Sequence, residues 1–264
     1  MTDAVMRLVR PFHFRGKRRL IDRIGAKNGI RSASIFGSTF ELNLADGGQR
    51  HIYQGTFEPH ETRLVRRYLK PGMTFVDVGA NVGYYTALAA HLAAAQGRVI
   101  AFEPSPYAFE RLTRMIAGNG LKQAEAVNAA LGDEPGTLDL YSSGDPANHS
   151  PSLVSAEDRP VLARVPVRTL DEEAKRLQLE RIDFIKIDVE GYEPSVLRGA
   201  KRLLAERRIR AILCEFNPWW LEKAGSDPES LERIIYDAGL TDVTEKRPFK
   251  GLYDIQNRMF TLRA

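Results

Sequence analysis

The alternation of short apolar segments with helical segments, from Met73 onward, constrains the fold of this chain more than any other feature. Repeated strand–helix units whose strands are apolar throughout predict a parallel sheet with helices on both faces. The predicted strands are Thr74–Val78, Arg98–Phe102, Ala124–Leu131, Thr137–Tyr141, Arg164–Val167, Asp183–Ile187, Arg210–Phe216, Thr241–Glu245 and Asn257–Leu262. The predicted helices are Tyr84–Ala95, Ser105–Ala117, Leu170–Leu179, Glu193–Glu206 and Pro228–Asp237.

Residues 1–70 precede this pattern and read as an N-terminal extension of helical and hairpin character. Ser34–Leu44 alternates like a strand, and the turn signal Asp46-Gly47-Gly48 predicts a hairpin that ends near Tyr53. Glu58–Leu69 has helical spacing and is stopped by Lys70-Pro71-Gly72. We therefore expect an extension over 1–70, acting as a substrate cap or a partner contact, and an α/β domain over 71–264.

The distribution of charge and the number of cysteines limit the possible binding partners and the cellular compartment of the protein. The net charge is only +4, but residues 1–31 hold nine Arg or Lys against Asp3 and Asp22. Such a segment could contact an anionic membrane surface or an acidic partner, and it could equally be a solvated basic helix face. The single Cys214 excludes an internal disulfide and Cys-rich zinc sites, so we expect a cytoplasmic protein. No apolar run reaches the roughly 20 residues of a membrane span.

The segment Asp77–Gly83 follows the first predicted strand and leads directly into a helix. Gly79 and Gly83 allow the backbone to turn sharply and to approach a ligand closely. Ligands of open α/β sheets bind beyond the carboxyl ends of the strands, where this turn lies. Glu103 follows the second strand at the same edge, where a carboxylate can accept both ribose hydroxyls of an adenosine. The alternatives are an ordinary tight turn and an acid that caps the next helix.

The charge of this turn distinguishes between two adenosine ligands. A dinucleotide site requires a glycine where Asn81 stands, and the Asp77 carboxylate would repel a diphosphate. A carboxylate would attract a cationic amino acid or a sulfonium group. The turn therefore favours S-adenosylmethionine over a dinucleotide.

Together, these motifs closely resemble the FkbM family of class I methyltransferases. The resemblance spans about residues 55–217, and its most distinctive part is Lys186–Gly191. The matching blocks are Phe75–Tyr85, Val99–Pro104, Asn128–Asp133, Val165–Leu170, Ile182–Glu193 and Ile212–Asn217. The family implies a Rossmann-like, doubly wound seven-stranded sheet whose last strand is antiparallel. It also implies methyl transfer, usually to a hydroxyl oxygen of a sugar, a lipid or another small molecule.

The resemblance also implies roles for individual residues. The methionine part of the cofactor is expected against Asp77, Gly79, Asn81 and Gly83, and the ribose against Glu103. The adenine is expected beside residues that follow the third strand, namely Asn128 and Ala129.

Methyl transfer chiefly requires alignment of the nucleophile with the methyl group, and a hydroxyl nucleophile also benefits from a base. Asp188 ends a strand at the predicted reaction centre and is the first candidate for positioning cofactor or substrate. Glu190 is a second acid, although both carboxylates could instead cap the following helix. His149, in a polar loop, is a candidate base or an exposed loop histidine.

Three hard oxygen ligands, Asp188, Glu215 and Asn217, fall at the ends of adjacent predicted strands. They could hold Mg²⁺ and bind a deprotonated diol, but hydrogen bonding within the turns is the favoured alternative.

Two other functions stay open from the sequence. The basic N-terminus could indicate a nucleic-acid methyltransferase, but the Asn-Pro-Pro-Tyr type signature for base amino groups is replaced by Asp188-Val189-Glu190-Gly191. A non-enzymatic, cofactor-binding partner protein is the third hypothesis, and the complete set of acids argues against it.

Overall fold

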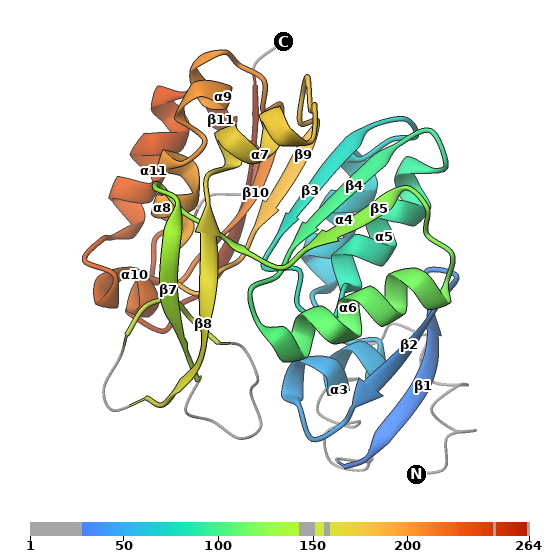
Figure 1. The fold of residues 1–264 in the computed structure, drawn as a ribbon. Helices are drawn as coiled ribbons and strands as arrows, with labels where there is room; N and C mark the ends of the chain where they lie inside the picture. The colour runs from blue at the N-terminus through green and yellow to red at the C-terminus, as the bar shows by residue number, and fades with distance from the viewer. Residues whose placement is uncertain (1–27, 143–150, 156–158, 245–246, 263–264) are drawn as a thin grey trace.

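The computed structural model describes residues 28–142, 151–155, 159–244 and 247–262 (Figure 1). His149 and all the basic residues of the N-terminal segment except Arg31 lie outside these ranges. None of the helices in the described ranges is long and apolar enough to cross a membrane.

A seven-stranded sheet forms the centre of the molecule, with the order β11-β12-β10-β9-β3-β4-β5. Its strands are β3 (Thr74–Val78), β4 (Arg98–Phe102), β5 (Ala124–Val127), β9 (Phe184–Ile187), β10 (Ala211–Phe216), β11 (Leu240–Asp242) and β12 (Gln256–Leu262). All neighbours pair in parallel except β12, which runs antiparallel to both β10 and β11. The predicted doubly wound sheet with an antiparallel last strand is confirmed.

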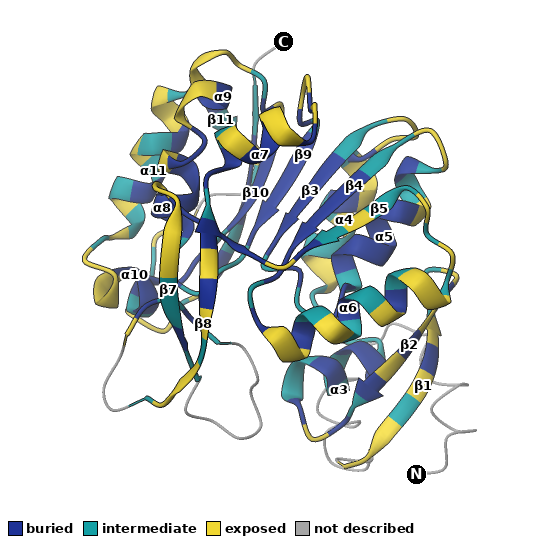
Figure 2. Ribbon diagram, in the orientation of Figure 1, coloured by how far each residue is buried: buried dark blue, intermediate teal, exposed yellow. Residues whose placement is uncertain are grey.

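Helices cover both faces of this sheet (Figure 1). One face carries α4 (Pro59–Tyr68), α5 (Tyr84–Ala93) and α6 (Pro106–Gly118), and the other carries α7 (Leu170–Arg176), α8 (Glu193–Arg198), α9 (Lys201–Ala205) and α11 (Pro228–Asp237). Successive side chains of a strand point to opposite faces, so Phe75 packs with α4 and α5 while Val76 packs with α7, α8, α9 and α11. Both faces of the sheet are therefore covered by helices, and nearly all residues of the central strands are buried (Figure 2).

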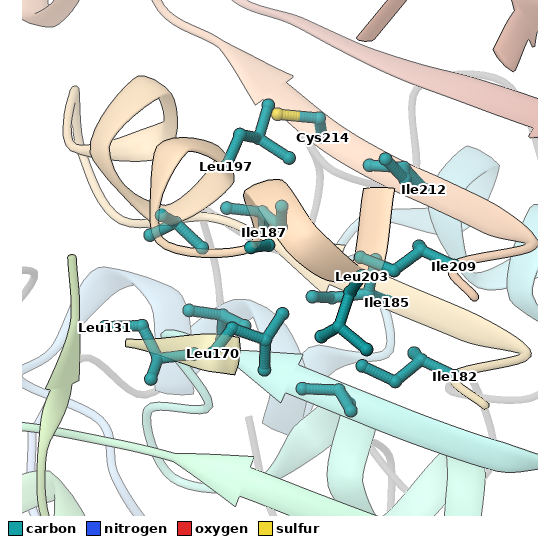
Figure 3. Close-up of a cluster of buried hydrophobic side chains, with 14 of the residues drawn as sticks. Leu131, Leu170, Ile182, Ile185, Ile187, Leu197, Leu203, Ile209, Ile212 and Cys214 are labelled. Atoms are coloured by element: carbon teal, nitrogen blue, oxygen red, sulfur yellow. The ribbon is translucent and has the colours of Figure 1, made fainter. Parts of the chain in front are cut away.

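One large cluster of buried hydrophobic side chains lies between β9, β10 and the helices α8 and α9 (Figure 3). Ile185 and Ile187 of β9 meet Leu197 of α8 and Leu203 of α9, and all four are essentially inaccessible to solvent. This packing holds the carboxyl ends of β9 and β10 in fixed positions relative to each other. The residues that directly follow β9 and β10 therefore start from well-defined positions at one edge of the sheet.

Two predicted elements are divided in the structure. The strand expected over Ala124–Leu131 ends at Val127, and β6 (Ala130–Leu131) pairs instead with β8 (Val161–Arg168) in a second sheet that also holds β7 (Gly136–Tyr141). The helix expected over Glu193–Glu206 breaks into α8 and α9 around Gly199. A Cβ at Gly199 would lie 1.9 Å from the carbonyl oxygen of Gly132, so the break between α8 and α9 packs directly against the segment that follows β6.

The N-terminal hairpin lies earlier than predicted. Strands β1 (Ile30–Ile35) and β2 (Ser38–Asn43) are joined by Phe36 and Gly37, which both have positive φ, as a two-residue hairpin turn requires. The expected turn at Asp46 is instead the start of α3 (Gly47–Gln54), where the Asp46 side chain accepts a hydrogen bond from the Gln49 N–H at 2.7 Å. Aspartate before glycine suits both a turn and a helix cap, so the local sequence did not separate them.

Candidate functional site

A cavity lies beyond the carboxyl ends of β3, β4, β9 and β10, and its empty space, including the open mouth, is about 1180 Å³. The β3–α5 turn lines it through Gly79, Ala80, Asn81 and Val82. Its ionisable lining residues are Asp46, Glu58, Tyr84, Tyr85, Glu103, Lys186, Asp188, Glu190 and Glu215. Ligands of open α/β sheets bind at this edge, so the cavity is the candidate site.

The β3–α5 turn is held against the end of β9 by backbone contact. Gly79 has φ +82°, and a Cβ there would lie 1.9 Å from the Asp188 carbonyl oxygen. The Asp188 N–H in turn donates to the Val78 carbonyl at 3.1 Å. Gly83, with φ +90°, leaves room for Met115 of α6. Glycine is therefore required at position 79 by backbone packing as well as by the turn, and at position 83 by the positive φ of the turn.

Glu103 follows β4, as predicted, and lies in the cavity wall almost fully buried. Its two carboxylate oxygens accept hydrogen bonds from the Asn81 N–H at 2.7 Å and the Ser105 N–H at 2.8 Å. Burial raises the pKa of Glu103 to about 7, although the two N–H donors oppose that rise. Each carboxylate oxygen has a second lone pair, so Glu103 can fix the turn and still accept a ligand hydroxyl.

Of the two residues expected beside adenine, Asn128 and Ala129, only Ala129 lines the cavity. Asn128 is exposed, does not line it, and donates through its side-chain amide to the carbonyls of Glu103 and Pro104 at 2.8 and 3.2 Å. Asn128 therefore stabilises the loop that carries Glu103.

Asp77 lies beneath the cavity and does not line it. It is 1% exposed and accepts a 2.7 Å hydrogen bond from the Thr86 hydroxyl of α5. Its partner in the β3–β9 register is Lys186, which is 2% exposed. Burial raises the pKa of Asp77, while the Lys186 ammonium and Thr86 oppose that rise. In this position Asp77 supports Lys186 and α5, and the expected direct contact with the methionine part stays a prediction.

Asp188 and Glu190, the predicted catalytic acids, both line the cavity. The Asp188 carboxylate forms an ion pair with the Lys186 ammonium, with 2.7 Å between Asp188 Oδ2 and Lys186 Nζ. Burial, then Asp188 and Glu193, raise the pKa of Glu190 to about 8. Glu193 Oε1 accepts from the N–H groups of Val189 and Gly191 at 3.0 and 3.2 Å and so holds the loop between β9 and α8, whose N-cap residue Tyr192 makes no side-chain capping hydrogen bond.

The three candidate metal ligands do not converge. Asp188 and Glu215 line the cavity, but the Asn217 side chain caps α10 (Pro218–Lys223) by accepting from the Trp220 N–H. Across residues 28–142, 151–155, 159–244 and 247–262, no group of three or more His, Cys, Asp or Glu side chains is arranged to hold a metal ion. Burial, followed by Asp188 and Glu190, raises the pKa of Glu215 well above its ordinary value.

The cavity residues that sequence patterns missed include Glu58, Tyr85 and Lys186. Glu58 and Tyr85 lie at the starts of two helices, and Lys186 stands inside an apolar strand. The signal was Lys186 itself, because a lysine in a buried strand must be paired with an acid. Here Asp77, Asp188 and Glu58 surround it, and although burial opposes them, they raise the pKa of its ammonium above the ordinary value.

Comparison with known proteins agrees with this geometry. The family model described as "Methyltransferase FkbM domain" matches residues 77–240. The chain is 32% identical to methyltransferase sdnD of Sordaria araneosa over 228 residues, covering 74% of this chain and 83% of sdnD. The chain belongs to the FkbM methyltransferase family.

Two further relatives have more specific names. This FkbM methyltransferase is 27% identical to the hexuronic acid methyltransferase AglP of Haloferax volcanii, over 64% of each chain. It is also 27% identical to the 2-O-methyltransferase NoeI of Sinorhizobium fredii, over 61% of this chain and 72% of NoeI. The matched domain holds Glu103, Asp188, Glu190 and Glu215, whereas Glu58 lies outside it.

Proposed function

We propose that the protein is an S-adenosylmethionine-dependent O-methyltransferase that acts on a hydroxyl group of a small molecule, with a sugar hydroxyl as the leading acceptor class. The observation that carries the proposal is one continuous cavity that joins the glycine turn and Glu103 to the carboxylates at the ends of β9 and β10. The names of AglP and NoeI support the sugar and the oxygen.

The donor set of the cavity fits this cofactor. Lys186 is the one lysine or arginine among the described lining residues, against Asp46, Glu58, Glu103, Asp188, Glu190 and Glu215. Lys186 is already paired with Asp188. Such a cavity favours a cationic ligand over a phosphate-bearing one. Glu103 would hold the ribose hydroxyls, the backbone of Gly79–Val82 would border the amino-acid part, and Ala129 would border the adenine.

The protein's own residues would then supply position and charge. The sulfonium cofactor, when bound, supplies a methyl group that is already activated for displacement. Asp188, held by Lys186, presents a fixed carboxylate toward cofactor and acceptor. Burial raises the pKa of Glu190 to about 8 and that of Glu215 well above its ordinary value, so both favour the protonated form more than an exposed glutamate does and can donate hydrogen bonds to acceptor oxygens. The edge of the sheet thus orients an acceptor hydroxyl, which is the main catalytic requirement.

The test is calorimetric titration of the purified chain with S-adenosylmethionine, beside a labelled-methyl assay against neutral and acidic methyl glycosides. Glu103→Ala should weaken cofactor binding by roughly 10-fold or more, since a hydrogen bond to a charged group contributes about 1.5–3 kcal/mol. Glu110→Ala, on exposed α6 beside Arg114, is the matched control and should bind normally. Asp188→Asn should lower methyl transfer more than binding. Absence of binding by the folded wild type would refute the proposed function.

A further inference from the structure

Glu58 is a cavity residue contributed from outside the matched family domain. It is the N-cap residue of α4, with φ 34° and ψ 61°, a left-handed conformation that is unfavourable for a residue with a Cβ. Its side chain makes no capping hydrogen bond to its own helix. The strained backbone and the unused cap together indicate that the Glu58 side chain is committed to something other than starting the helix.

That commitment is to the hydroxyl of Tyr85, which donates to Glu58 Oε2 at 2.6 Å. Tyr85 is buried in α5, and its ring lies 4.7 Å from Lys186 Nζ. Lys186 in turn holds Asp188 at 2.7 Å. Glu58 and Asp188 therefore flank one ammonium group, joined through rigid elements α5 and β9. One oxygen of Glu58 is directed by Tyr85, so the orientation of its carboxylate is determined by the fold.

Three of the other cavity acids are less available to accept a proton. Asp188 is already engaged in a direct ion pair with Lys186. Both oxygens of Glu103 accept backbone N–H groups. Burial raises the pKa of Glu215 well above its ordinary value. Glu58 faces Lys186, Asp188, Tyr85 and Glu61, and burial, its largest influence, raises its pKa to about 7, which suits a base at neutral pH.

We propose that Glu58 faces the methyl group that is transferred and accepts the proton of the acceptor hydroxyl, with Tyr85 as the residue that positions its carboxylate. This inference rests on the proposed function. The acceptor oxygen forms a bond to the methyl carbon as the carbon–sulfur bond breaks, and the electron pair of that bond goes to sulfur, which becomes a neutral thioether. The hydroxyl proton passes to a carboxylate oxygen of Glu58, and later to solvent. Residues before the matched domain thereby complete its reaction centre.

The first experiment compares two cofactor analogues by calorimetric titration of the full chain. Sinefungin carries an ammonium group where S-adenosylmethionine carries its methyl group, whereas S-adenosylhomocysteine carries no charge there. If Glu58 faces this position, wild type prefers sinefungin, and Glu58→Gln reduces that preference by about 10-fold or more. Binding of S-adenosylhomocysteine should change less than about 3-fold, a shift below 1 kcal/mol.

Three comparisons separate this role from a structural one. Gln at position 58 can still accept from Tyr85, so Glu58→Gln should fold. Tyr85→Phe keeps the ring beside Lys186 but loses the hydroxyl, so it should lower the preference for sinefungin in the same direction and by less. Glu110→Gln, at an exposed acid of α6 outside the cavity lining, should leave it unchanged. An unaltered preference in Glu58→Gln would overturn the inference.

A second readout concerns the proton itself. Titration of sinefungin at pH 6.5 in buffers of different ionisation enthalpy measures the protons exchanged on binding. A cation beside Glu58 should ionise it, so wild type should release more protons than Glu58→Gln, and equal release in the two proteins would overturn the proton-accepting role. If wild type binds neither analogue, the proposed function itself fails. If it binds both and Glu58→Gln behaves as wild type, only the role of Glu58 fails.

Discussion

Gly79→Ala tests the contact between the β3–α5 turn and the end of β9, on which the geometry of the cavity depends. The new Cβ would lie 1.9 Å from the Asp188 carbonyl oxygen and 3.0 Å from its carbonyl carbon, whereas an ordinary contact begins at 3.4 Å. The turn and β9 would therefore have to separate by about 1.5 Å. Neither side of this contact is the flexible end of a side chain, so local adjustment cannot relieve it.

The expected loss of unfolding free energy has three parts. A left-handed alanine costs about 1–2 kcal/mol. Overpacking of a dense site costs about 1–3 kcal/mol. Weakening of the hydrogen bond from the Asp188 N–H to Val78 costs about 0.5–1.5 kcal/mol. Gly79→Ala should therefore lose about 3–6 kcal/mol, a large share of the roughly 5–15 kcal/mol by which domains are stable.

Gly72→Ala is the matched control for this measurement. Gly72 has the same φ of +82°, but a Cβ there would meet nothing within 4 Å. Urea denaturation of the two variants should place Gly72→Ala about 1–2 kcal/mol below wild type, because it has only the backbone cost. The difference between the variants then measures the contact with Asp188. If both variants lose the same unfolding free energy within about 0.5 kcal/mol, the close approach of turn and strand is refuted.

Two further predictions concern the buried charges. Lys186→Met should cost about 3–5 kcal/mol of unfolding free energy, because it leaves Asp77 and Asp188 without their cation; a loss below about 1 kcal/mol in urea denaturation would contradict the pairing. Burial raises the folded-state pKa of Glu58 and Glu103 to about 7 and of Glu190 to about 8, above the ordinary 4.5. The stability these groups contribute is present below pH 4.5 and is lost as pH rises through their folded pKa values. The urea midpoint should therefore fall between pH 5.5 and 8, and a midpoint that rises would oppose this reasoning.

Local sequence was sufficient for the elements around the turn. Thr74–Val78 and Arg98–Phe102 were predicted with the bounds that the structure has, and the helix expected from Ser105 begins at Pro106 with Ser105 as its N-cap. These features depend on residues near one another in the chain: apolar runs, a capping hydroxyl and a proline in the first helical turn. The resemblance to the FkbM family supplied the number of strands in the sheet and the antiparallel last strand, which spacing alone does not determine.

Tertiary structure decided which acids face the cavity. Asp77 and Glu103 both lie at the edge of the sheet in sequence terms, yet only Glu103 lines the cavity, because the side chain of Asp77 points toward α5. Glu58 is 45 residues before Glu103, and no local pattern distinguishes it from other helix-cap acids. Glu58 lies near Lys186 and Tyr85 only because α4 and α5 pack side by side on the face of the sheet that includes Phe184 of β9.

The sequence by itself thus determined the parallel sheet, the glycine turn and the family, since these follow from periodicity, glycine geometry and the order of motifs. Only the folded chain decided which carboxylates are buried together and which cation they share. The physical reason is that burial and charge pairing depend on distances between residues far apart in the chain, and those distances are set by helix and sheet packing.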